Sequence, residues 1–116
     1  MRDIMLQMAG GLAILAALLH GVLGETVVFP RARIDPPWVL TLMRAVWHCG
    51  VVAWLGGGAL LMAAPSFDSD RARRWIIFVV VAIYGSAAIG NAIATQGRHF
   101  GWIVLLAVVI LTLVGI

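Results

Sequence analysis

Polar side chains that could do chemistry stand near the ends of the apolar stretches of this chain. His20 and Glu25 close the first stretch, and Arg44 and His48 stand near the start of the second. Arg44 and His48 are four residues apart, so a helix places them on one face, about 6 Å apart along its axis. His20 and Glu25 are five apart, roughly 140° round a regular helix. They would not hold one ion together unless the helix loosens at a glycine between them.

Further along the chain, Asn91 lies near the end of the third apolar stretch, and Arg98 and His99 lie just before the fourth. If each stretch crosses a membrane once, all of these groups fall on the same side. We treat them as one polar cluster, and this asymmetry is the strongest functional signal in the sequence. The predicted cluster comprises His20, Glu25, Arg44, His48, Asn91, Arg98 and His99.

Two interpretations of this cluster centre on Glu25. In the first it is structural: Glu25 pairs with Arg44 on the next helix, because an unpaired carboxylate near lipid is costly. His20 then turns toward His48, or each histidine bonds to the backbone. In the second, Glu25 with the two histidines forms a proton- or ion-coupled transport site, since histidine titrates in the useful pH range.

Two other interpretations invoke a ligand. His20 and His48, with His99 as a third candidate, could bind a metal ion or act as axial ligands of a b-type haem. No H-x-x-x-H, E-x-x-H or C-x-x-C-H spacing supports such a site. Arg44, Arg98 and His99 could instead contact an anionic lipid or another small anion.

The elements that position these groups follow from composition. The chain is 63% hydrophobic and 11% charged, with a mean hydropathy of +1.06, whereas soluble domains have about a quarter charged residues. Charge-free stretches cover residues 4–24, 45–67, 75–97 and 100–116. A bilayer core requires roughly 20 apolar residues, and the last stretch reaches only about 25 Å.

These stretches predict an all-α integral membrane four-helix bundle. It forms a single transmembrane domain over residues 1–116, with helices at about 4–28, 38–64, 70–96 and 100–116. The arginines flank the apolar stretches, where the lipid bilayer rather than nucleic acid is the natural partner. Arg71, Arg73 and Arg74 cluster between the second and third helices. This favours cytoplasmic termini in a multi-pass membrane protein.

Small residues recur at every fourth position on three of the helices, a spacing that lets backbones approach closely in lipid. The first three helices are therefore expected to pack tightly, and the fourth to be peripheral. Because four short helices enclose little interior, we also expect a homo-oligomer or a larger membrane complex. The predicted packing residues are Ala9, Ala13, Ala17 and Gly21; Cys49, Ala53 and Gly57; and Ala82, Ser86, Gly90 and Ala94.

Three segments, LHGVLGE, RAVWHCGVVAW and QGRHFGW, resemble small four-span proteins of the bacterial inner membrane to which no function is assigned. The resemblance implies that His20, Glu25, Arg44, His48, Arg98 and His99 belong to one shared feature, and it supplies no reaction. The WLGG segment at residues 54–57 is similar to membrane proteins of the copper-resistance and cytochrome b561 type. That second likeness is the source of the haem alternative.

No nucleophile–base pair and no glycine-rich phosphate loop after a strand occurs in the sequence, so we do not expect an enzyme. The favoured function is that of an accessory or ligand-binding subunit of a membrane assembly, with no cofactor. The alternatives are a small homo-oligomeric transporter or channel and a protein that binds haem or a metal ion.

Overall fold

The computed structural model describes residues 1–116 and contains no strand, so the all-α prediction is confirmed. It has four helices when α1, η1 and α2, which follow one another without a break, are counted as one. Three helices are long and apolar enough to cross a membrane, and the last is shorter. In chain order the elements are α1 (Arg2–Leu23), the π-turn η1 (Gly24–Val28), α2 (Phe29–Arg31), α3 (Pro37–Ala63), the 3-10 turn η2 (Ala64–Ser66), α4 (Asp70–Ala94) and α5 (Gly101–Val114).

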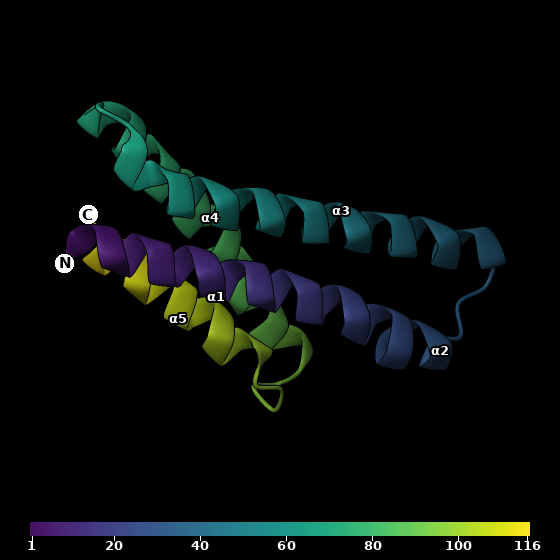
Figure 1. The fold of residues 1–116 in the computed structure, drawn as a ribbon. Coiled ribbons are helices and arrows are strands. Elements are labelled where there is room, and N and C mark those ends of the chain that lie inside the picture. Colours follow the sequence, from purple (N-terminus) through teal and green to yellow (C-terminus); the bar gives the residue numbers. More distant parts are fainter.

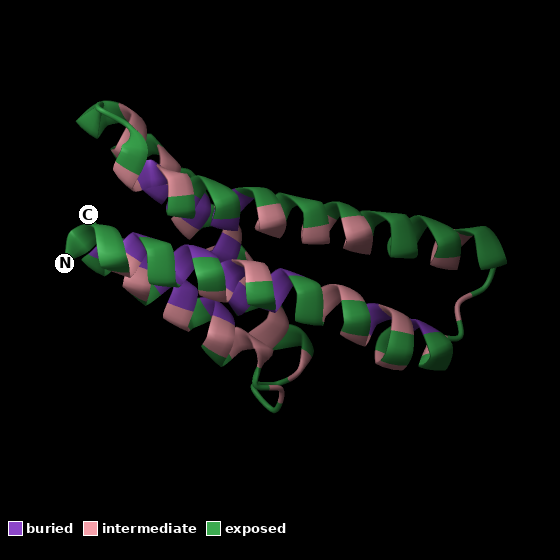
Figure 2. Cartoon of the chain, in the orientation of Figure 1, coloured by how far each residue is buried: buried purple, intermediate pink, exposed green.

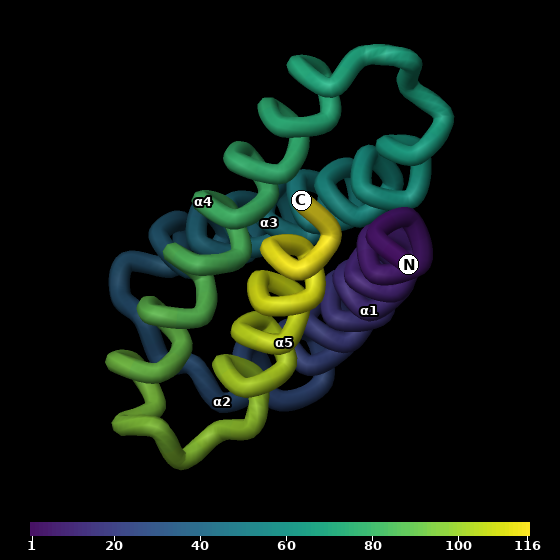
Figure 3. Tube along the Cα trace, turned by 90° about the vertical axis from the view of Figure 1, so that its left-hand side faces the viewer, coloured from purple at the N-terminus to yellow at the C-terminus, as the bar shows by residue number.

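The helices form a ring in which α1 packs on α3 and α5, and α4 packs on α5 and α3. α1, η1 and α2 form one continuous rod that runs beside α3, while both termini and the α3–α4 loop lie at one end (Figure 1). Figure 3 shows α5 between α1 and α4. The expectation of a peripheral last helix is therefore wrong. α5 buries Leu105, Val108, Val109 and Thr112, because branched aliphatic side chains fill the groove between its neighbours.

The small-residue stripes have different fates on the three helices. On α1, Ala9, Ala13 and Ala17 are fully buried. Gly21 is half-buried, and a Cβ at this position would be 3.5 Å from Val51. This stripe faces the interior because α1 has neighbours on two sides.

On α3 the stripe is buried only at Gly57, whereas Cys49 and Ala53 are exposed. On α4 the stripe does not pack within the chain, since all four stripe residues face outward. The face of α4 that packs is the one with the larger side chains at helical spacing, because they bury more apolar area. The outward-facing stripe residues are Ala82, Ser86, Gly90 and Ala94.

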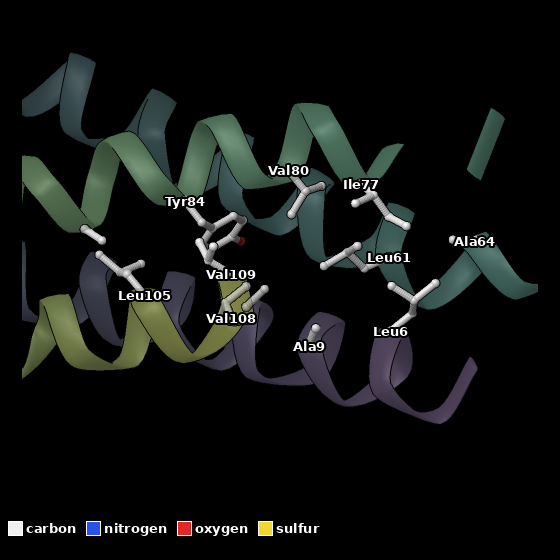
Figure 4. Close-up of a cluster of buried hydrophobic side chains, with 12 residues drawn as sticks. Leu6, Ala9, Leu61, Ala64, Ile77, Val80, Tyr84, Leu105, Val108 and Val109 are labelled. Atoms are coloured by element: carbon white, nitrogen blue, oxygen red, sulfur yellow. The ribbon is translucent and has the colours of Figure 1, made fainter. Parts of the chain in front are cut away.

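Tyr84 anchors the interface between α3 and α4. Its hydroxyl donates a 2.6 Å hydrogen bond to the carbonyl oxygen of Trp54, and its ring is fully buried. A Cβ on Gly57 would lie 3.3 Å from this ring, so a small residue on α3 leaves room for it. Figure 4 shows Tyr84 beside Val109 in the buried apolar cluster.

Burial is concentrated where all four helices meet, near the end that carries the termini (Figure 2). At the other end α1, η1, α2 and the first half of α3 extend beyond α4 and α5 (Figure 1). We call this extension, residues 24–48, the arm. It leaves Leu42, Met43 and Val46 at least half exposed, so the polar residues on the arm have neighbours only from the α1–α3 hairpin.

The two long helices of the hairpin come closest at Gly10 and Gly58. A Cβ on Gly10 would lie 2.6 Å from the carbonyl oxygen of Gly58, and one on Gly58 would lie 2.9 Å from that of Gly10. Both clashes are with backbone, so rotation of a side chain cannot relieve them. The neighbouring Gly11 has open space at its Cβ position.

Gly10→Ala is therefore expected to lower the free energy of unfolding by about 1–3 kcal/mol, the usual cost of overpacking. Gly11→Ala is the matched control. It should be neutral or stabilising by up to about 1 kcal/mol, because alanine favours helix over glycine. Unfolding in a denaturing detergent titration measures both changes. Equal effects of the two variants would contradict the close approach.

Candidate functional site

Glu25 binds two partners from α3. The Arg44 guanidinium donates two hydrogen bonds to the carboxylate, one of them at 2.8 Å from Nε to Oε1. His48 Nε2 lies 2.6 Å from the same Oε1. The structure thus contains the expected pairing of Glu25 with Arg44, and it adds His48 as a third member. The side chains of Arg44 and Glu25 are 56% and 33% exposed, so the triad lies at the surface of the arm.

The helix around Glu25 is not a regular α-helix. Gly24–Val28 form the π-turn η1, which ends with Phe29 N donating to the carbonyl of Gly24. Thr26 Oγ1 donates a 2.7 Å bond back to the carbonyl of Val22, a side-chain contact of the kind that often bends helices. The helix therefore loosens at one of the two glycines between His20 and Glu25. Single π-turns of this kind are frequent at functional sites.

Gly24 is required at this turn because Trp47 of α3 lies directly against it. A Cβ at position 24 would collide with the indole ring. The indole Nε1 donates a 3.1 Å hydrogen bond to the carbonyl oxygen of His20, one turn earlier. Trp47 thereby fixes the height at which α1 and α3 meet, and with it the placement of Glu25 opposite Arg44.

His20 does not turn toward His48, and that expectation is wrong. Its imidazole stacks on the Trp47 indole, with ring centroids 3.9 Å apart and an interplanar angle of 6°. The centroid of the Trp54 ring lies 4.5 Å from that of His20, with the two planes tilted by 34°. Neither ring nitrogen of His20 has a hydrogen-bond partner in the chain, whereas His48 is bound to Glu25. The two histidines therefore belong to different surroundings.

The turn between α4 and α5 brings His99 to the level of His20. Gln96 and Gly97 adopt left-handed backbone conformations, with φ of 52° and 72°, which reverse the chain. The carbonyl of Gly97 accepts a 3.0 Å bond from the indole of Trp102, and His99 Nδ1 accepts a 3.0 Å bond from the backbone N–H of Gly101. Since Nδ1 is an acceptor, the neutral imidazole of His99 carries its proton on Nε2.

A pocket lies where α1 meets this turn. It has a volume of about 50 Å³, and α1, α3, α4, α5 and the turn all contribute to its lining. The polar residues around it are His20, Asn91 and His99, beside the ring of Trp54. Gly101 closes one side, and a Cβ there would lie 2.7 Å from His99 Nδ1 and 3.2 Å from Asn91 Nδ2. Only glycine lets these two side chains approach α5 so closely.

Asn91 has an unsatisfied oxygen in this pocket. Its Oδ1 is shielded from the surroundings and has no hydrogen-bond partner in the chain. The backbone carbonyl of the same residue is satisfied, since Thr95 Oγ1 donates to it at 2.7 Å. A buried amide oxygen without a partner costs about 1–3 kcal/mol. Asn91 therefore combines an unsatisfied buried oxygen with a place in the pocket lining.

The predicted single cluster is therefore two separate groups. Glu25, Arg44 and His48 form a triad on the arm, whereas His20, Asn91 and His99 line the pocket. Arg98 belongs to neither: it is exposed, and its side chain makes no hydrogen bond or ion pair, while its backbone N–H donates to the carbonyl of Thr95. The anion site proposed from Arg44, Arg98 and His99 is not assembled, because only His99 lines the pocket.

The residues do not fit a haem or metal ion between His20 and His48. His20 is stacked on an indole and His48 is bound to Glu25. No group of three or more His, Cys, Asp or Glu side chains comes together. The pocket is also far smaller than the roughly 300–1,000 Å³ that enclose a drug-sized molecule.

Two of the residues that shape the site were not singled out from the sequence. Tyr84 fixes Trp54 through its hydrogen bond to the Trp54 carbonyl, and Gly101 admits His99 and Asn91. Tyr84 is the only tyrosine in the chain, which is a weak signal. Trp47 and Trp54 are seven residues apart, a spacing that places both on one face of a helix, and both contact His20.

Comparison of the chain with protein-family models, curated proteins and solved structures finds no match.

Glu25→Gln and Arg44→Gln are each expected to lower the melting temperature in detergent, because each leaves the other partner unpaired. The double variant should cost little more than the larger single change, since the interaction is lost only once. Thermal unfolding of the four proteins measures this coupling.

The control combines Glu25→Gln with Arg73→Gln, which breaks the separate ion pair with Asp3 at the opposite end of α1. There the two losses should add. Additive losses for Glu25 and Arg44 as well would count against the triad as a structural unit.

Proposed function

We propose that this chain is a four-span membrane protein without a catalytic role, which binds a small ligand in the pocket as an accessory or ligand-binding subunit. The single observation that carries the proposal is the unsatisfied Oδ1 of Asn91, a residue that lines the pocket together with His20 and His99. Polar groups within membrane helices are expensive, and they mark functional sites.

The placement in a bilayer follows from two polar levels. One is the Asp3–Arg73 ion pair near the termini, and the other is the α4–α5 turn with Gln96 and Arg98. Residues 3–20 of α1 rise about 26 Å between these levels, close to the roughly 30 Å of a hydrocarbon core. The pocket then lies near one edge of the core, and the Glu25 triad lies beyond it among headgroups. An exposed ion pair is tolerable there.

The transport alternative has less support. Both carboxylate oxygens of Glu25 are engaged by Arg44, with His48 sharing one of them. The triad lies on the arm, outside the four-helix core (Figure 1). A carboxylate held in this way serves as a clamp between α1 and α3.

The arm supports a role within an assembly. Under this placement Leu42, Met43 and Val46 lie outside the bilayer core, yet each is at least half exposed. Contiguous exposed apolar side chains outside lipid mark interaction sites. A second copy of the chain or a larger membrane complex would cover them.

The topology proposal is tested with single cysteines in a Cys49→Ala background. In cells of a bacterial host, Arg33→Cys in the loop before α3 is expected to react with a membrane-impermeant maleimide. Asp68→Cys in the loop before α4 should react only after lysis, because the arginines at positions 71, 73 and 74 favour the cytoplasm. Labelling of both positions from one side would contradict the four-span arrangement. Reversed labelling would contradict only the orientation.

The ligand proposal is tested by native mass spectrometry of protein released from nanodiscs. The wild-type chain is expected to carry a bound small molecule that Asn91→Leu loses. Ser86→Leu is the control, since Ser86 lies on the outward face of the same helix and donates to the carbonyl of Ile83. The same spectra report additional chains. A bare monomer in every sample would overturn both the ligand and the assembly.

A further inference from the structure

The pocket presents three polar groups that lack partners within the chain. Asn91 Oδ1 is an acceptor shielded from the surroundings. His99 Nε2 is a donor, because Nδ1 already accepts from Gly101. The imidazole of His20 has both nitrogens free, and its stacking on Trp47 holds the ring plane fixed. The residues that line the pocket therefore carry both an acceptor and a donor without a partner in the chain.

The charge of the lining selects against ions. The polar side chains in the lining are one amide, two imidazoles and the indole of Trp54, all uncharged donors or acceptors, and no arginine or carboxylate lines the pocket. Arg44 is bound to Glu25 on the arm, and Arg98 does not line the pocket. An anion would find no guanidinium and a cation no carboxylate, so desolvation would not be repaid. The fitting group is uncharged.

The group must also be small and able both to donate and to accept a hydrogen bond. A hydroxyl can donate to Asn91 Oδ1 and accept from His99 Nε2, whereas a ketone or an ether can only accept. A hydroxyl would also form a hydrogen bond if the Asn91 amide were flipped, with its nitrogen in the place of its oxygen. A volume of about 50 Å³ exceeds the roughly 10–15 Å³ that one water requires on the same measure, and it admits only the tip of a larger molecule.

The remainder of the molecule would lie in lipid. Leu19 and Phe100 line the pocket and are 44% and 56% exposed. Under the placement proposed above, they open it toward the hydrocarbon rather than toward water. Most of the lining is apolar, which suits an apolar body entering with its polar end first.

We propose that the pocket binds the uncharged hydroxyl of a membrane-soluble molecule, with Asn91 and His99 as its hydrogen-bond partners and Trp54 beside it. This inference rests on the proposed ligand-binding function and names its chemical class. A long-chain alcohol and an alkylated phenol share this chemistry, and the experiment separates them.

The test compares each hydroxyl compound with its own methyl ether. Protein in nanodiscs is titrated with 4-nonylphenol, 4-nonylanisole, 1-dodecanol and dodecyl methyl ether, and binding is followed by tryptophan fluorescence. At least one hydroxyl compound is expected to bind saturably and about tenfold more tightly than its ether, since the ether loses the donated hydrogen bond. The stronger of the two hydroxyl compounds identifies an aromatic or an aliphatic ligand.

Variants tie this difference to the site. Asn91→Leu should remove the preference for the hydroxyl, and Ser86→Leu should retain it. Gly101→Ala, which crowds His99 and Asn91, should weaken binding without changing the outward face of α4. Trp54→Phe should reduce the signal and thereby identify the reporter.

The outcomes separate the two proposals. If native mass spectrometry finds a bound molecule that lacks a hydroxyl, or if alcohol and ether bind equally, the hydroxyl assignment is wrong and the ligand-binding function stands. If no molecule co-purifies and no probe binds saturably, the pocket holds only water and both proposals fall.

Discussion

The contact between the backbones of α1 and α3 at Gly10 and Gly58 is the constraint on which the remaining arrangement depends. Two helices that touch without side chains between them are fixed in distance and height. Further along the hairpin the spacing is set by indole rings instead, since Trp47 lies against Gly24 and its Nε1 bonds to the His20 carbonyl. The first contact secures the core at the end with the termini. The second secures the polar groups at the other end.

The two polar groups differ because their surroundings differ. Glu25 and Arg44 form an ion pair that His48 joins, and all three lie on the arm, where their side chains stay partly exposed. His20, Asn91 and His99 lie where the four helices still meet, and there an uncharged set is far less costly. Charge is thus used to clamp the hairpin, whereas neutral polar groups with unsatisfied atoms are left facing the pocket.

Several features could be predicted from the sequence with simple physical rules. Composition and the charge-free stretches predict four helices, since only apolar runs of this length fit a bilayer. The cost of an unpaired carboxylate predicts that Glu25 meets Arg44. The stripe of Ala9, Ala13 and Ala17 was expected to be buried, and it is. The equivalent stripe on α4 faces outward. The sequence could not predict this, because spacing alone does not show which face of a helix its neighbour covers.

The amino-acid sequence by itself determined the helical class, the polarity of one end and the partner of Glu25, since each follows from local composition or from the penalty on a lone charge. The tertiary structure alone decided that α5 fills the groove between α1 and α4, that His20 stacks on Trp47 rather than meeting His48, and that Asn91 and His99 share a pocket. These depend on a π-turn at Gly24 and a left-handed turn at Gln96 and Gly97. Such turns rotate side chains by angles that regular helical spacing cannot supply.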